Sequence, residues 1–112
     1  MKANAEKIIN DVCSLYGVTR EELVSPSKLQ CLFFARAMVG YFLARYSQLS
    51  ESEVGKIINR HHSTINYYKR IYKHEFAYNA KFRNFANIVK DGLEFKTAFQ
   101  EELEQELNEI IG

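Results

Sequence analysis

Apolar side chains recur every three or four residues along most of the chain, and this spacing predicts a series of amphipathic helices. The first predicted helix runs from Ala3 to Tyr16, and Gly17 follows at the position where helices commonly end. A capping-box pattern at Thr19 and Glu22 predicts a short second helix that carries Leu23 and Val24. With one proline and five glycines in 112 residues, the chain has few residues that break helices. We therefore expect an all-α fold.

The next three predicted helices form the middle of the chain. The segment from Lys28 to Tyr46 is apolar on nearly every side, which is typical of a helix at the centre of its domain. A second capping box, from Ser50 to Glu53, opens a fourth helix that ends near Ile58. A fifth helix is expected to start at His61 or His62 and to reach about Glu75. Its core-facing side is predicted to hold Ile65, Tyr68, the stem of Lys69 and Tyr72, and its opposite side Ser63, Asn66, Tyr67 and Arg70.

The segment from Glu53 to Ile65 has the pattern of a helix-turn-helix. Gly55 suits the close approach of two helices, and Asn59-Arg60 suits a tight turn between them. The next four residues, His61 to Thr64, are polar and begin a helix, where a helix-turn-helix places the side chains that contact base edges. The free N–H groups of a helix N-terminus also attract phosphate. The pattern therefore predicts a protein that reads double-stranded DNA.

Two further helices are predicted after Asn79. Asn79 is expected to cap a sixth helix that extends to Lys90, with Phe82, Phe85, Ile88 and Val89 turned inward, and Asp91-Gly92 is expected to end it. Phe95, Phe99, Leu103, Leu107 and Ile111 then recur every four residues among acidic ones, which predicts a seventh, amphipathic helix. We therefore divide the chain into residues 1–92, a helix-turn-helix domain, and residues 93–112, an acidic C-terminal helix.

Charge is distributed unevenly, although the net charge of the whole chain is only +1. Residues 1–24 carry three basic and four acidic side chains (−1), residues 25–90 eleven and three (+8), and residues 91–112 one and seven (−6). A strongly basic middle fits a polyanionic partner, although unevenly charged solvated faces would give the same sums. The acidic segment could pack on its own domain, bind a second copy or another protein, or cover the basic face in place of phosphate.

No motif indicates an enzyme or a bound cofactor. The chain has no catalytic constellation and no G-x-x-x-x-G-K-[ST] loop, so we expect neither enzymatic activity nor nucleotide binding. Its three histidines and two cysteines lack zinc-site spacing, so we expect no metal, and Cys13 and Cys31 are expected to be buried thiols. No signal peptide is visible, and the longest apolar stretch, Leu32 to Ala44, is shorter than the roughly 20 residues that span a bilayer. We therefore expect no membrane association and a cytoplasmic location.

Four motifs, in order, resemble the C-terminal DNA-binding domain of the bacterial replication initiator DnaA. They are Leu15-Tyr16-Gly17-Val18-Thr19 with Glu22-Leu23-Val24-Ser25, then Phe34-Ala35-Arg36-Ala37-Met38, then Leu49-Ser50-Glu51-Ser52-Glu53-Val54-Gly55, and finally Asn59-Arg60-His61-His62-Ser63-Thr64-Ile65. The resemblance covers about residues 5–90. It implies a six-helix domain with a Trp-repressor-like helix-turn-helix that binds a short nonpalindromic duplex site, in the control of replication or transcription. Because no ATP-binding loop is found, we expect a standalone DNA-binding domain.

The resemblance also implies roles for individual residues. Arg36 is similar in position to an arginine that enters the minor groove in the family. The expected major-groove readers are Arg60, His61, His62, Ser63 and Asn66, and the expected phosphate contacts are Lys56, Thr64, Tyr67 and Arg70. The chain departs from the family where His61 replaces an aspartate and where the turn is one residue shorter. An aspartate can only accept a hydrogen bond, for example from cytosine, whereas a histidine can donate to a purine N7, so the target site is expected to differ.

A helical protein-interaction adaptor is the alternative function. In that case residues 93–112 would bind a protein partner or a second copy, and duplex binding would be weak and lost at physiological salt.

Overall fold

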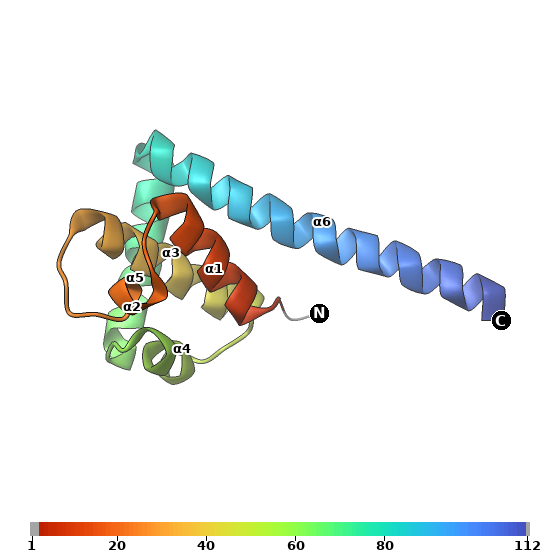
Figure 1. Cartoon of the computed structure of the whole chain (residues 1–112), viewed down its shortest axis with the longest axis horizontal. Helices are drawn as coiled ribbons and strands as arrows, with labels where there is room; N and C mark the ends of the chain where they lie inside the picture. The colour runs from red at the N-terminus through yellow and green to blue at the C-terminus, as the bar shows by residue number, and fades with distance from the viewer. Residues whose placement is uncertain (1–2, 112) are drawn as a thin grey trace.

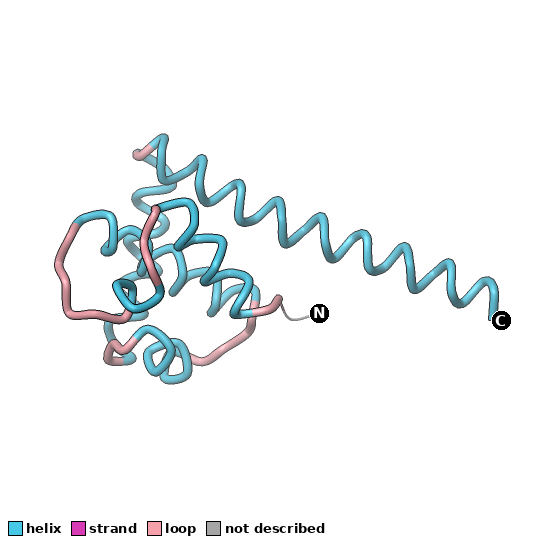
Figure 2. The backbone as a smooth tube through the Cα atoms, in the orientation of Figure 1, coloured by secondary structure: helices cyan, strands magenta, loops and turns pink. Residues whose placement is uncertain are grey.

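The computed structural model describes the backbone of residues 3–111 and the side chains of residues 3–93, 105, 106 and 109. Within these residues the chain forms six helices: α1 (Ala5–Tyr16), α2 (Arg20–Leu23), α3 (Gln30–Tyr46), α4 (Glu51–Ile58), α5 (His62–Tyr78) and α6 (Ala80–Ile111) (Figure 1). Figure 2 shows helices joined by loops, with no strand in the described part of the chain. The prediction of an all-α fold is confirmed.

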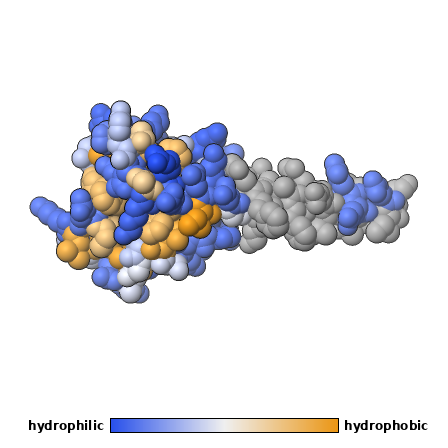
Figure 3. Space-filling model, turned by 90° about the horizontal axis from the view of Figure 1, so that it is seen from above, coloured by the Kyte–Doolittle hydropathy of each residue, from blue (hydrophilic) through white to orange (hydrophobic). Residues whose placement is uncertain are grey.

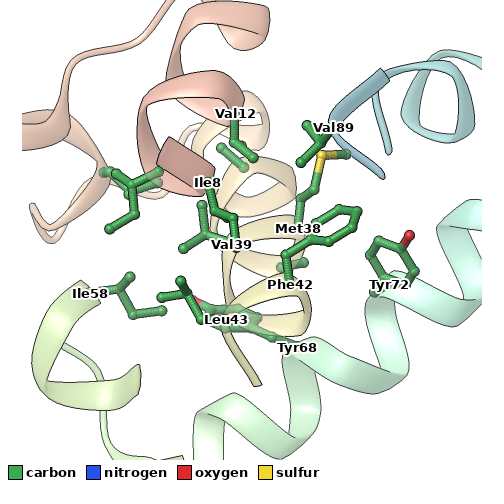
Figure 4. Close-up of a cluster of buried hydrophobic side chains, with 14 of the residues drawn as sticks. Ile8, Val12, Met38, Val39, Phe42, Leu43, Ile58, Tyr68, Tyr72 and Val89 are labelled. Carbon is green, nitrogen blue, oxygen red and sulfur yellow. The ribbon is translucent and has the colours of Figure 1, made fainter. Parts of the chain in front are cut away.

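The helix α3 lies at the centre of the body and contacts α1, α2, α4 and α5. Its side chains are buried on several sides, as its apolar sequence predicted. Figure 4 shows how the core is assembled, with α3 contributing Met38, Val39, Phe42 and Leu43, α1 Ile8 and Val12, α4 Ile58, α5 Tyr68 and Tyr72, and α6 Val89. Burying each such side chain contributes about 1.5–3 kcal/mol before the loss of conformational entropy is counted. The packing of these core side chains therefore sets the positions of α4 and α5.

Side-chain caps from Asn4, Thr19, Ser50 and Asn79 define where α1, α2, α4 and α6 begin. Asn4 Oδ1 accepts the N–H of Glu6 at 2.9 Å, and Thr19 forms both halves of its capping box with Glu22. Ser50 Oγ accepts the N–H of Glu53 at 3.1 Å, and Asn79 Oδ1 accepts the N–H of Phe82 at 3.1 Å. Each cap contributes about 1 kcal/mol by pairing an N–H that the helix leaves free. The predicted caps at Thr19, Ser50 and Asn79 are confirmed.

The predicted helix end at Asp91-Gly92 is wrong, because α6 continues without a break from Ala80 to Ile111. Leu93, directly after Gly92, is buried at 6% exposure, and α6 packs on both α1 and α5. A glycine inside a helix costs about 1 kcal/mol relative to alanine, which is less than the burial of one leucine returns. In Figure 1 the far part of α6 extends well past the other helices.

Two predictions about burial are also wrong. Ile88 is 56% exposed, because the inward stripe of α6 consists of Phe82, Ala86, Val89 and Leu93, which lie one above the other at helical spacing. Cys31, in the first turn of α3, is exposed, whereas Cys13 is buried as expected.

The surface of the body and the described residues at the far end of α6 differ in hydropathy. The side chains of the predicted stripe from Phe95 to Ile111 lie outside the described residues. Gln105, Glu106 and Glu109 are exposed. Figure 3 shows mixed hydrophobic and hydrophilic surface on the body, and the few coloured residues at the far end of α6 are hydrophilic. Among the described residues, none of the helices combines the length and the apolar character that crossing a membrane requires.

Candidate nucleic-acid interface

The turn between α4 and α5 is tight, and two residues make it so. A Cβ atom at Gly55 would lie 2.5 Å from the backbone oxygen of Arg60, which is far closer than real contacts allow. Asn59 ends α4 in the left-handed conformation with φ 58°, a region that asparagine tolerates better than most residues. The N–H of Arg60 donates to the carbonyl of Gly55 at 2.8 Å and closes the turn. The predicted helix-turn-helix is therefore present in the fold.

The first residues of α5 are exposed and ordered by their own side chains. His61 is the N-cap, and its Nδ1 accepts the N–H of Ser63 at 3.2 Å and lies 2.8 Å from the hydroxyl of Ser63. The rings of His61 and His62 are in contact, with centroids 4.1 Å apart. His61, His62 and Ser63 are exposed, and Thr64 is half-buried. Three polar side chains at the start of α5 are thus open to a partner.

The rest of α5 divides into a buried and an exposed side, as predicted. Ile65, Tyr68 and Tyr72 are buried, whereas Asn66, Tyr67 and Arg70 are exposed. The guanidinium carbon of Arg70 lies 5.9 Å from the centre of the Tyr67 ring, a cation–π distance. An uninterrupted exposed side therefore follows the helix from its first residue to Arg70.

Lysines differ in their availability on these two helices. Lys69 Nζ donates to Glu51 Oε1 at 3.2 Å, and this ion pair joins α5 to the start of α4. Lys56, on α4, is exposed and lines the same shallow depression as Arg60, His61 and His62. Lys56 is thus beside the start of α5, in a position to hold a polyanion, and Lys69 already has a carboxylate partner.

Arg36, on α3, is buried beside the loop between α2 and α3, and it helps to line a cavity next to Asn59 and Arg60. Its side chain is 3% exposed, and its guanidinium donates to four backbone carbonyls: those of Leu23 (2.7 Å), Ser27 (2.7 Å), Ser25 (2.8 Å) and Glu22 (3.1 Å). Burial, with a smaller contribution from the positive charge of Arg60, lowers the pKa of Arg36 from its ordinary value. Arginine nevertheless stays protonated at any physiological pH. The minor-groove role of Arg36 stays a prediction, and in this structure four of its five N–H donors are occupied by the loop.

The loop that Arg36 holds is joined directly to the turn of the helix-turn-helix. Arg60 donates to the carbonyl of Ser25 at 2.7 Å, so that Arg60 and Arg36 share this acceptor. Asn59 Nδ2 donates to the carbonyl of Val24 at 3.3 Å. Between loop and turn lies an open cavity of about 730 Å³, which Lys28, Phe33 and Arg60 help to line. The exposed cation Lys28 was missed by the sequence reasoning, because only the fold brings residues 24–29 beside residues 59–60.

The site is suited to binding and contains no arrangement typical of metal chemistry. Among the described residues, no three histidine, cysteine or carboxylate side chains are grouped so that they could hold a metal ion. Nine of the ten predicted contact residues lie on α4, α5 and the turn between them, and Arg36 is the exception. The exposed members of this set offer imidazoles, hydroxyls, amides and cations at the start of one helix, which can hydrogen-bond base edges and phosphates.

Known proteins resemble this chain over the same region. Residues 5–71 match the family described as the bacterial dnaA protein helix-turn-helix. A chromosomal replication initiator protein DnaA from Oleidesulfovibrio alaskensis is 33% identical over 60 residues, which is 54% of this chain and 13% of the relative. The initiators named DnaA from Pseudothermotoga lettingae and Thermosipho africanus are each 31% identical, over 62 and 64 residues. The match thus spans 13–15% of these relatives' length. The chain belongs to the bacterial DnaA helix-turn-helix family.

Proposed function

We propose that the chain is a non-enzymatic, sequence-specific binder of double-stranded DNA and acts through α4 and α5 in the control of replication or transcription. The observation that carries this proposal is the exposed polar start of α5, from His61 to Ser63, held in place by the tight turn at Gly55. Helix-turn-helix proteins insert this part of the second helix into the major groove. The family match covers α4 and the part of α5 up to Ile71, and the relatives are named as replication initiators.

Roles within the surface follow from exposure and chemistry. His61, His62, Ser63 and Asn66 project from the start of α5 and would read base edges. Arg60, at the turn, would join them through the N–H donors that its bonds to the carbonyls of Ser25, Ile58 and Asn59 leave free. Lys56 on α4 and Arg70 on α5 are exposed cations, and with Thr64 and Tyr67 they would hold phosphates. Phosphate contacts set the position of the protein on the duplex, whereas base contacts carry the sequence preference.

In this proposal Arg36 acts through the loop. Four of the five N–H donors of the Arg36 guanidinium are engaged with backbone carbonyls, and each carbonyl would lose this partner if the side chain turned toward DNA. We therefore assign Arg36 to positioning residues 22–27, which in turn hold Arg60 through the carbonyl of Ser25. Lys28, exposed on the same loop, is free to add a phosphate contact at this side of the turn.

A selection from a random duplex library tests the proposal. The full chain is incubated with the library at roughly 150 mM salt, where nonspecific phosphate contacts are weakened, and the bound DNA is sequenced. We expect an enriched motif of several base pairs. The matched control is a variant with Asn66→Ala and Ser63→Ala, which keeps the cations and should bind with a degraded motif. Recovery of random sequence by the unchanged protein would refute sequence-specific binding.

The second candidate function, a protein-interaction adaptor, is favoured by one observation. The helix α6 continues far beyond the packed body, and its segment from residue 91 has a net charge of −6. A helix of this length with no described packing partner at its end could serve a second copy or another protein, with residues 93–112 forming a separate unit. Removing residues 94–112 should leave the selected DNA motif unchanged if DNA reading is the main function. A shortened protein that loses the motif would shift the assignment to the C-terminal segment.

A further inference from the structure

We infer that His61 reads a guanine of the target site, with its Nε2–H donating to the guanine N7 in the major groove, and that the cap of α5 sets this preference. The inference rests on the proposed function and names the base that one residue would select. It depends on which ring nitrogen of His61 carries the proton.

The cap decides the position of that proton. The backbone N–H of Ser63 can only donate, and it points at Nδ1 of His61 at 3.2 Å. Nδ1 must therefore accept, which means that it carries no proton. A neutral imidazole has one donor and one acceptor nitrogen, so the proton of His61 is on Nε2. The hydroxyl of Ser63, 2.8 Å from Nδ1, is compatible with this assignment, because it can rotate to donate to the same lone pair.

The ring is also held in orientation. One edge is tied to the start of α5 by the cap, and one face lies against the ring of His62 at 4.1 Å. Nε2 is on the opposite edge from Nδ1, His61 is exposed, and no atom of the described residues pairs with Nε2. The residue thus presents a single fixed N–H donor at the point where a recognition helix meets the bases.

A fixed donor discriminates among the four bases. Cytosine presents only an amino donor in the major groove, so it offers nothing to a second donor. The adenine N7 stands beside an amino donor, and the thymine O4 stands beside a methyl group. Guanine presents two neighbouring acceptors, N7 and O6, and no donor. Guanine is therefore the best partner for His61. An aspartate at the same position would accept and would select a base with an amino group.

Modified DNA tests the atom itself. In the duplex selected by the unchanged protein, each guanine is replaced in turn by 7-deazaguanine, which has a carbon in place of N7. We expect one position to weaken binding by about three- to tenfold, the effect of one hydrogen bond to a base. The His61→Ala variant should bind more weakly to the normal site and show no further loss at that same position. If the His61→Ala variant shows the same 7-deazaguanine losses as the unchanged protein at every guanine, the inference is wrong.

A second variant guards against loss of the helix start. His61→Asp keeps an oxygen that can cap Ser63, so its circular dichroism should be unchanged, but it has no donor. A selection with this variant should replace guanine at the sensitive position by cytosine or adenine and leave the other positions as they were. A retained guanine would overturn the role of His61 while the enriched motif still supported DNA reading. A library without any motif after selection with the unchanged protein would instead refute the proposed function itself.

Discussion

Replacing Arg36 with methionine tests whether the buried guanidinium holds the loop or serves the DNA. The long apolar side chain of methionine fills most of the volume and brings no buried charge of its own. What it removes is the donor set for the carbonyls of Leu23, Ser25, Ser27 and Glu22. The loop between α2 and α3 then has four backbone acceptors that must find water or remain unpaired.

The expected loss of stability follows from these contacts. A hydrogen bond to a charged group contributes about 1.5–3 kcal/mol, but the four cannot be added, because burying the guanidinium has a desolvation penalty. Breaking a buried charged network by removing one partner commonly costs about 3–5 kcal/mol, and we expect Arg36→Met to fall at the low end because no charge is left behind. Against a total of roughly 5–15 kcal/mol for a domain of this kind, such a loss is large.

Urea unfolding followed by circular dichroism measures the effect. The matched control is Arg45→Met on the same helix, whose arginine is exposed and touches mainly the ring of Tyr46, and we expect a change within about 0.5 kcal/mol. A free energy of unfolding for Arg36→Met within about 1 kcal/mol of the unchanged protein would refute the role of the clamp. If that stable variant also lost DNA affinity, direct contact of Arg36 with the minor groove would be the better account.

Three further predictions concern the turn, the phosphate contacts and the buried tyrosines. Gly55→Ala should destabilise the protein by about 1–3 kcal/mol in urea unfolding, because the added Cβ meets the backbone of Arg60. The control Gly40→Ala should be neutral or stabilising, because its Cβ would lie at an ordinary 3.5 Å from Tyr68. Equal effects of the two substitutions would contradict the close approach at the turn. Arg70→Ala should weaken binding to all duplexes alike and reduce the slope of log affinity against log salt by about one unit, so a change confined to one base pair would contradict a phosphate contact. Burial raises the pKa of Tyr16 to about 12 and raises the pKa of Tyr72 further. The stability that each neutral phenol contributes is therefore complete below the ordinary tyrosine pKa near 10, and it is lost as the pH rises from about 10 through the raised pKa of the folded protein. Absorbance at about 295 nm should show these tyrosines titrating late in the folded protein and normally in urea, and a single step near pH 10 in both would contradict this.

Much of the fold could be predicted from hydrogen bonds and periodicity within short stretches of the sequence. The capping residues Thr19, Ser50 and Asn79 each pair with the N–H group three positions ahead, so the starts of three helices are set by neighbours in the chain. The same holds for the inward and outward sides of α5, because a helix repeats every 3.6 residues. The helix-turn-helix could be predicted for the same reason, because Gly55, Asn59 and the polar residues after them shape the turn through contacts with their neighbours in the chain.

Contacts between distant segments decided what the sequence left open. Arg36 was predicted from the family resemblance to contact DNA, and no neighbour in the chain offers an acceptor for its N–H groups. Its actual partners lie 9–14 positions away, on a loop that only the packing of the helices brings close. The same applies to Gly92, where the burial of Leu93 against the body outweighs a weak local preference to end α6. His61 could be recognised as a polar residue at a helix start, but the tautomer it presents depends on the cap geometry. Local hydrogen bonds and periodicity are thus encoded in short stretches of sequence, whereas burial and the pairing of long side chains depend on the whole fold.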